Sequence, residues 1–289
     1  MKFHPLSIYR KNDYFHHKKQ LKMSISHRTK TVIGAIAGDV IGSVFEWNNI
    51  KTTEFPLFST ESSFTDDSIL TMAVTDCILN NRSFKEGLHC YGRKYSDKVF
   101  GHIFRSWFES DDPQPYMSFG NGSAMRVSAV GFAYNSLSEV LEAAKQSAEI
   151  THNHIEGVIG AQSTASAIFL ARTGSTKAEI KSFIETNFPY NLDISLDSIR
   201  PNYEHDYTAK GSIPFAIRAF LESTDYENAI RLAISIGGDS DTIACITGGI
   251  AAAFYKEIPD EIIEGVIQRL PQEFIDLLNQ FEEKFNSAS

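Results

Sequence analysis

AIRLAISIGGDSDTIACITGGIAAAFY, residues 229–255, is the stretch from which the architecture of this chain can be inferred. Two apolar runs, residues 229–236 and 243–255, flank a short polar segment. Runs this rich in small apolar residues are typical of helices that are buried on all sides. The polar segment holds both Asp239 and Asp241, although one cap residue is enough to satisfy the free N–H groups at a helix start. The second acid indicates that a positive charge lies in front of this helix.

Apolar and small residues at helical spacing recur along the rest of the chain. Cap residues, and prolines suited to a first helical turn, mark the expected helix starts. We expect helices at residues 31–44, 68–79, 83–95, 100–108, 122–134, 138–150, 155–172, 175–187, 214–222, 225–236 and 242–255, one from Pro259 and one at 272–286. Strand signals are nearly absent. The sequence therefore predicts an all-α fold, a compact orthogonal bundle of about a dozen helices around a cleft.

Length and charge limit the domain organisation and the partners. A chain of 289 residues can bury a sizeable core. Its formal net charge of −9 argues against nucleic-acid binding and suits a site for metal cations. The charge is uneven, because residues 1–30 hold eight Lys and Arg residues against one acid. We expect residues 1–29 to be a basic tail, disordered or loosely docked, and residues 30–289 to form a single all-α domain.

The cysteines and the apolar runs bear on location. None of the three cysteines belongs to a CxxC pair, and we expect all three to be buried free thiols in a reducing compartment. We find no run of about 18 apolar residues, so no membrane helix is expected. The N-terminus lacks the apolar region of a secretory signal. We therefore expect a cytoplasmic monomer without a membrane partner.

Two expected helix starts carry clusters of acids, 65–67 (TDD) and 239–242 (DSDT). Ordinary capping explains either cluster alone. If the two helix starts meet, however, four carboxylates would repel one another unless a hard divalent cation bound between them. The sequence thus predicts an oxygen-ligand metal site built from Thr65, Asp66, Asp67, Asp239, Asp241 and Thr242.

Glu46 follows another buried helix and is a candidate fifth acid, although a solvated helix end would look the same. Zinc is disfavoured, because HExxH is absent and His152 and His154 are too close in sequence to share a helix face. Magnesium and manganese both accept oxygen ligands, so the sequence leaves the choice between them open.

A glycine-rich segment, 118–122 (SFGNG), precedes the helix expected at 122–134. Exposed backbone N–H groups near a helix start can cradle a phosphate, although a plain helix-initiating turn has the same pattern. Arg126 is expected to contact a phosphate or to pair with an interior acid. His152, just before another helix, is either a structural hydrogen-bonding residue or a ligand contact.

Five segments in the same order and at similar spacing resemble the ADP-ribosylglycohydrolase family. They are GAIAGDVIGSVFE (34–46), FTDDS (64–68), GNGSAMR (120–126), TH followed by GAQSTASA (151–167) and GGDSDTIA (237–244). The resemblance covers residues 31–260. It is weaker at residues 205–213, which match the family only in part.

The resemblance implies an all-α fold around a two-magnesium centre, with manganese as the alternative. Thr65, Asp66 and Asp67 would bind one ion, and Asp239, Asp241 and Thr242 the other, with Asp241 shared. The implied catalytic carboxylates are Glu46, Asp66, Asp67 and Asp241. The implied contacts to ADP-ribose are Ser118, Phe119, Gly120, Asn121, Gly122 and His152.

These features together predict a Mg²⁺-dependent hydrolase that cleaves the glycosidic bond between ADP-ribose and an acceptor. We expect the acceptor to be arginine, on an ADP-ribosylated protein or a small conjugate, with serine- or nucleotide-linked ADP-ribose left open. Two alternatives remain: a non-catalytic ADP-ribose-binding protein of the same fold, and a Mg²⁺-dependent nucleotide phosphohydrolase.

Overall fold

The computed structural model describes residues 31–285, so the expected tail at 1–29 lies outside the described residues. This part of the chain forms fifteen helices and no strand, which confirms the predicted all-α class. The helices are α2 (Ile33–Gly42), α3 (Asp66–Asn80), α4 (Phe84–Lys94), α5 (His102–Glu109), α6 (Gly122–Met125), α7 (Ser128–Ala133), α8 (Leu137–Glu149), α9 (Ile155–Arg172), α10 (Lys177–Asn187), α11 (Leu196–Ile199), α12 (Ala209–Glu222), α13 (Tyr226–Ser235), α14 (Ser240–Tyr255), α15 (Asp260–Ile267) and α16 (Gln272–Phe285).

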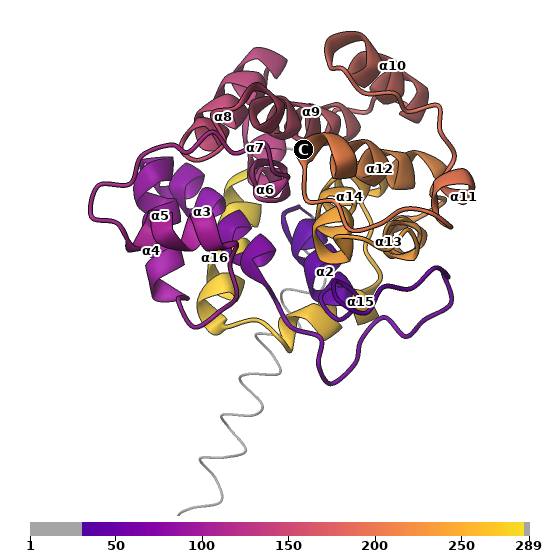
Figure 1. Ribbon diagram of the computed structural model, residues 1–289, viewed down its shortest axis with the longest axis horizontal. Coiled ribbons are helices and arrows are strands. Elements are labelled where there is room, and N and C mark those ends of the chain that lie inside the picture. The colour runs from indigo at the N-terminus through magenta and orange to yellow at the C-terminus, as the bar shows by residue number, and fades with distance from the viewer. Residues whose placement is uncertain (1–30, 286–289) are drawn as a thin grey trace, which may run out of the picture.

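Helices α2 and α14 pack against each other in the middle of the molecule (Figure 1). Gly34 lies against Gly248 and Gly42 lies against Asp241, so the two helices run antiparallel. Their backbones nearly touch: a Cβ atom at Gly34 would lie 2.8 Å from the Gly248 carbonyl oxygen, and one at Gly42 would lie 2.5 Å from the Asp241 Cα atom. The small residues recognised in the sequence therefore allow a close helix crossing that brings the end of α2 to the start of α14.

The other helices surround this pair (Figure 1). Helices α9, α12 and α13 pack on α14, while α3 and α15 pack on α2. Apolar side chains from all of these helices form one contiguous core. Every residue of α2 is buried, as expected for a helix that is apolar on all sides.

The single helix expected at 122–134 is instead two helices, α6 and α7. The break follows Met125, whose carbonyl oxygen accepts hydrogen bonds from Thr71 Oγ1 (3.2 Å) and Cys245 Sγ (3.4 Å). Side chains of α3 and α14 thus satisfy a carbonyl group that would otherwise continue the helix. This break and the short α11 account for the helices beyond those expected.

Helix α12 begins earlier than the expected start at Pro214. Thr208 is its N-cap and accepts a hydrogen bond from the Gly211 N–H (3.0 Å). Pro214 therefore lies inside the helix, where it has no N–H to offer the carbonyl group of Lys210. The segment between α10 and α12 contains the short helix α11.

Two further expectations concern the cysteines and membrane helices. Cys77 and Cys245 are buried free thiols, whereas Cys90 is exposed, which corrects the expectation for that residue. It lies on α4, whose buried residues are Gly87, Leu88 and Gly92, so it belongs to the solvent-facing side.

None of the helices within residues 31–285 has the length and apolar character that a membrane crossing requires.

Candidate active site

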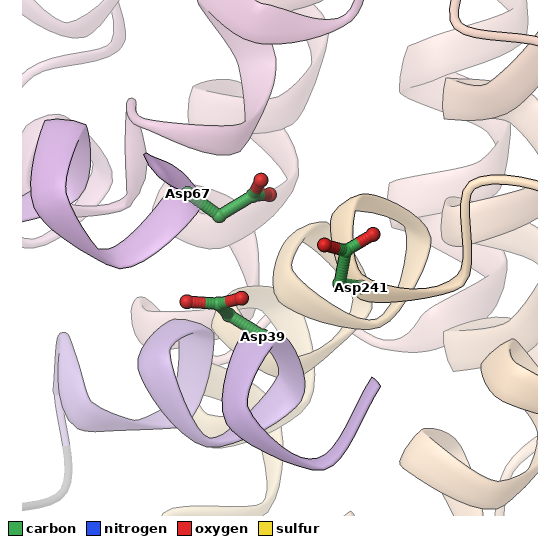
Figure 2. A group of neighbouring side chains, drawn as sticks. All are labelled: Asp39, Asp67 and Asp241. Carbon is green, nitrogen blue, oxygen red and sulfur yellow. The ribbon is translucent and has the colours of Figure 1, made fainter. Parts of the chain in front are cut away.

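Carboxylates from three helices meet where the end of α2, the start of α3 and the start of α14 converge. Figure 2 shows Asp39, Asp67 and Asp241 facing one another, and each offers an oxygen within 4.8 Å of the others. Glu46, Asp239 and Asp241 form a second group by the same criterion. Asp241 belongs to both groups, so the two acid clusters predicted from the sequence do come together.

Asp39 is the site residue that sequence reasoning missed. It is completely buried on α2 and accepts hydrogen bonds from Thr65 N (3.0 Å), Thr65 Oγ1 (2.7 Å) and Ser68 N (3.1 Å). The Ser68 hydroxyl also donates to it. Asp39 thereby holds the first turn of α3 against α2. The available signal was an acid inside an otherwise apolar helix, because such a charge is rarely buried unless partners satisfy it.

The two threonines predicted as metal ligands are hydrogen-bonded to acids of the cluster. Thr65 caps α3 and accepts from the Asp67 N–H (3.2 Å) while its hydroxyl donates to Asp39. Thr242 Oγ1 donates to Asp67 Oδ2 (3.2 Å). Asp66 is half-buried beside them and belongs to neither group of three. The hydroxyl oxygens of both threonines retain lone-pair capacity for a cation.

Burial disfavours the charged forms of these acids. It is the main cause that raises the pKa of Glu46 to about 7 and that of Asp66 to about 8, and nearby carboxylates raise both further. Burial, followed by repulsion from neighbouring acids, also raises the pKa values of Asp67 and Asp241 well above their ordinary range. The cluster can therefore ionise fully only when positive charge is supplied.

A metal ion fits the residues that are present. Asp67 Oδ1 is buried and has no hydrogen-bond partner within residues 31–285, which is costly unless something else binds it. The surrounding groups are carboxylate and hydroxyl oxygens, the donor set of a hard divalent cation. Asp39 differs, because four hydrogen bonds already occupy its oxygens. We therefore regard Asp39 as a residue that positions the ligands.

The glycine-rich segment lies directly beside the acids. Asn121 Nδ2 donates to Asp239 Oδ2 at 2.6 Å, and both side chains are buried. The segment is held on its other side by an antiparallel bridge between Gly120 and Thr208. The predicted loop and the predicted metal residues are therefore in direct contact.

His152 lies beside this loop. A Cβ atom at Gly122 would lie 3.2 Å from the His152 ring, so only glycine fits there without displacing the imidazole. His152 Nδ1 shares a hydrogen bond with Thr151 Oγ1 (2.7 Å). Burial and the nearby Arg126 hold the pKa of His152 well below its usual value, so the ring is neutral near pH 7.

Arg126 fulfils neither of its two expected roles. The guanidinium group is completely buried and donates to Ser147 O (2.7 Å) and Thr151 Oγ1 (2.9 Å). It thus contacts no acid within residues 31–285, and its complete burial leaves it inaccessible to a phosphate at the surface. Arg126 supports the histidine from behind, a role that depends on tertiary packing.

Residues 203–208 join the two halves of the site. At one end, a Cβ atom at Gly238 would lie 2.4 Å from the Tyr203 ring and 3.1 Å from the Glu204 carbonyl oxygen. At the other end, Thr208 pairs with Gly120. A cavity of about 580 Å³ opens beside this segment. It is lined by Phe119, Glu156, Tyr203, Asp206, Thr208, Lys210, Gly211 and Phe215.

The comparison with known protein families agrees with this arrangement. The family model described as ADP-ribosylglycohydrolase matches residues 25–288, nearly the whole chain. This protein belongs to the ADP-ribosylglycohydrolase family. The resemblance carried by five short sequence segments is thereby confirmed.

Relatives within the ADP-ribosylglycohydrolase family match most of this chain at low identity. ADP-ribosylhydrolase ARH3 of Mus musculus is 25% identical and covers 82% of this chain and 86% of its own length. ADP-ribosylarginine hydrolase Tri1 of Pseudomonas putida is 24% identical, and the match covers 87% of this chain and 78% of the Tri1 chain. A solved structure titled ADP-ribosylglycohydrolase-related protein complex superposes with a TM-score of 0.66 at 23% identity, covering 88% of this chain and 95% of that one. At this identity the superposition shows a shared fold.

Proposed function

We propose that this protein is a Mg²⁺-dependent hydrolase that cleaves the bond between ADP-ribose and an acceptor arginine. One observation carries the proposal: Asn121 of the glycine-rich segment is hydrogen-bonded to Asp239 of the acid cluster. A phosphate-binding loop and a cation site in direct contact suit a substrate that has a diphosphate at one end and a reacting ribose at the other.

The proposed metal ligands are Thr65, Asp66, Asp67, Asp239, Asp241 and Thr242, with Asp241 shared between two ions. Two observations support this assignment. Asp67 Oδ1 is buried without a hydrogen-bond partner among the described residues, and Asp241 belongs to both groups of three acids. Magnesium is proposed, with manganese as the alternative. When bound, two such cations would hold hydroxyl groups of the distal ribose and would orient a water molecule.

ADP-ribose would bind along Ser118, Phe119, Gly120, Asn121, Gly122 and His152. Backbone N–H groups of the loop are suited to the diphosphate. Neutral His152 beneath Gly122 offers its remaining ring nitrogen without adding charge. Phe119 is partly exposed and offers a ring face for stacking.

The proposed catalytic carboxylates are Glu46, Asp66, Asp67 and Asp241. In the reaction the bond between the anomeric carbon of the distal ribose and the guanidine nitrogen breaks, and the oxygen of water bonds to that carbon. One water proton is taken up by a carboxylate, and the departing nitrogen gains a proton in return. In the transition state positive charge develops at the anomeric carbon, and nearby carboxylates stabilise this charge. Glu46, with a pKa of about 7 in the metal-free protein, is suited to exchanging this proton.

The proposed substrate is an ADP-ribosylated protein or a small ADP-ribosyl conjugate. The name of the Tri1 relative supports arginine as the acceptor, whereas the ARH3 relatives carry no acceptor in their names. We also propose a cytoplasmic monomer that does not bind nucleic acid. The net charge of −9 and the three free cysteines are consistent with that proposal.

A single assay tests the proposal. The protein is incubated with arginine-ADP-ribosylated protein in the presence of Mg²⁺, Mn²⁺ or EDTA, and the released products are separated. We expect free ADP-ribose to be released with either cation and none with EDTA. ADP-ribose binding without release would favour the non-catalytic alternative. Release of AMP or phosphate would favour the nucleotide phosphohydrolase.

A further inference from the structure

An exposed pair of aromatic rings lies next to Glu46. The Trp47 side chain is 74% exposed although it is the largest apolar side chain type. Its ring stacks on that of His205, with centroids 5.4 Å apart and planes 15° from parallel. The stack holds an indole in a fixed orientation at the surface, where a tryptophan without a binding role would be expected to bury more of its area.

Both members of the stack are tied to the acid cluster. The Trp47 side chain lies close to the Glu46 carboxylate, which belongs to the preceding residue. His205 belongs to residues 203–208, which press against Gly238 at one end and pair with the glycine-rich segment at the other. His205 also lies near Asp239. The stack therefore lies at the border of the acid cluster, beside Glu46.

We propose that Trp47 and His205 form the platform that receives the acceptor, and that they select a guanidinium group. This inference rests on the proposed function, in which ADP-ribose occupies the glycine-rich side and Glu46 exchanges a proton with the leaving group. The departing nitrogen must then lie beside Glu46, next to the Trp47 ring. A planar guanidinium stacks on an aromatic face and is attracted by the negative charge of that face.

The charge of the site points to the same occupant. The two groups of acids bring together five carboxyl groups, those of Asp39, Glu46, Asp67, Asp239 and Asp241, which is one more than the four positive charges of two divalent cations. A cationic acceptor is therefore favoured at this border, whereas a serine hydroxyl gains nothing from the remaining charge and little from the ring. A nucleobase would also stack but would gain nothing from the charge.

The test compares Trp47→Ala and Trp47→Phe with the wild type on arginine-linked, serine-linked and nucleobase-linked ADP-ribose. We expect Trp47→Ala to lower kcat/KM for the arginine conjugate about 5- to 30-fold, the range of a cation–π contact. Trp47→Phe should recover most of this loss, because it keeps a ring face. Both variants should keep the wild-type affinity for free ADP-ribose, which shows that the fold and the other half of the site are intact.

A second measurement needs no turnover. Trp107, the other tryptophan, is only 5% exposed, so acrylamide quenching of fluorescence reports mainly on Trp47. With Mg²⁺ and ADP-ribose present, arginine amide should protect Trp47 from acrylamide, and citrulline amide, its uncharged counterpart, should not. Protection in a protein that hydrolyses none of the conjugates would uphold the platform while refuting the proposed activity.

Three outcomes would overturn the platform. Equal protection by arginine amide and citrulline amide would remove the charge selectivity. An equal loss of kcat/KM on all three conjugates would make Trp47 a general support for Glu46. A loss confined to the nucleobase conjugate would assign the stack to a base instead of a guanidinium.

Discussion

At the scale of single residues, the acid cluster depends on one aspartate that makes its hydrogen bonds across the helix interface. Asp39 accepts from the backbone N–H groups and the hydroxyl groups of both Thr65 and Ser68. These two residues belong to the cap and first turn of α3, which carries Asp66 and Asp67. The position of half the proposed metal ligands is therefore set from α2.

Asp39→Asn tests this positioning role. The amide nitrogen cannot accept the hydrogen bonds that a carboxylate oxygen accepts, so buried donors lose their partner, each at about 1–3 kcal/mol. We expect a lower free energy of unfolding, measured with urea, and weaker Mg²⁺ binding, measured by calorimetry. Asp276→Asn on α16, outside both groups of three acids, is the control. Unchanged Mg²⁺ affinity in Asp39→Asn would show that α3 finds its position without Asp39.

Asp66→Ala and Asp241→Ala test the proposed ligands themselves. Each removes a buried or half-buried carboxylate that repels its neighbours when no cation is bound. We expect turnover to be abolished while the far-UV circular dichroism stays that of the wild type. The metal-free variants should be no less stable than the metal-free wild type, because a source of repulsion is gone. Wild-type turnover by either variant would refute the two-metal assignment.

At the scale of elements, the close crossing of α2 and α14 brings the acids together. A Cβ atom at Gly248 would lie 2.2 Å from the Gly34 carbonyl oxygen, which is backbone and cannot move alone. A Cβ atom at Gly249 would instead meet side-chain atoms, the nearest being Ser128 Oγ at 3.1 Å. These neighbouring glycines on one helix therefore differ only in what they face.

Gly248→Ala and Gly249→Ala form a matched pair. Both raise the helix propensity of α14 by about 1 kcal/mol, and only Gly248→Ala forces the two backbones apart. We expect Gly248→Ala to lower the free energy of unfolding by about 1–3 kcal/mol, as overpacking does, and to weaken Mg²⁺ binding. Gly249→Ala should leave Mg²⁺ binding unchanged and should not lower the free energy of unfolding. Equal effects of the two substitutions would refute the contact between the helix backbones.

Asn49 joins the loop after α2 to the turn before α14. Asn49 Nδ2 donates to Glu46 O (2.9 Å) and Gly238 O (2.9 Å), and Asn49 Oδ1 accepts from Gly238 N (2.7 Å). Asn49 thus connects the backbone that carries Glu46 with the backbone that leads into Asp239. Gly238 has a φ of +74°, a conformation that glycine adopts readily.

Asn49→Ala should loosen both carboxylates at once. Residues that hold metal ligands in place typically contribute about 10- to 100-fold to metal affinity or activity, and we expect a loss of kcat in that range with KM little changed. Asn48→Ala is the control, because the Asn48 side chain makes only a long contact to Val44 O (3.5 Å). A similar loss in both variants would mean that the connection through Gly238 is not what matters.

At the scale of the whole molecule, the buried acids couple folding, pH and metal binding. Their pKa values lie above those of the unfolded chain, so between pH 4 and the folded pKa values the folded protein holds more protons than the unfolded one. The stability that this difference contributes is full at low pH. It is lost as the pH rises through about 7 for Glu46 and about 8 for Asp66.

Magnesium should reverse this loss. In the proposed function Mg²⁺ binds the ionised carboxylates, so its stabilisation should grow as the pH rises. We expect saturating Mg²⁺ to raise the Tm more at pH 8 than at pH 5.5, each kcal/mol of coupling adding about 2–4 °C. Scanning calorimetry of the wild type at both pH values checks this. An Mg²⁺-induced shift that is equal at both would contradict ionisation-linked binding, and Asp241→Asn, which removes the shared ligand, should show little shift at either.

The sequence by itself determined the all-α class, most helix positions, the family and the acids at the starts of α3 and α14. Those features are local: an apolar period, a cap residue or a pair of acids is encoded within one segment. The tertiary structure decided the rest: the role of Asp39, the break between α6 and α7, the Asn49 connection and the stack of Trp47 on His205. Each of these joins segments far apart in the chain, and such contacts depend on how closely the helices pack, which no single segment encodes.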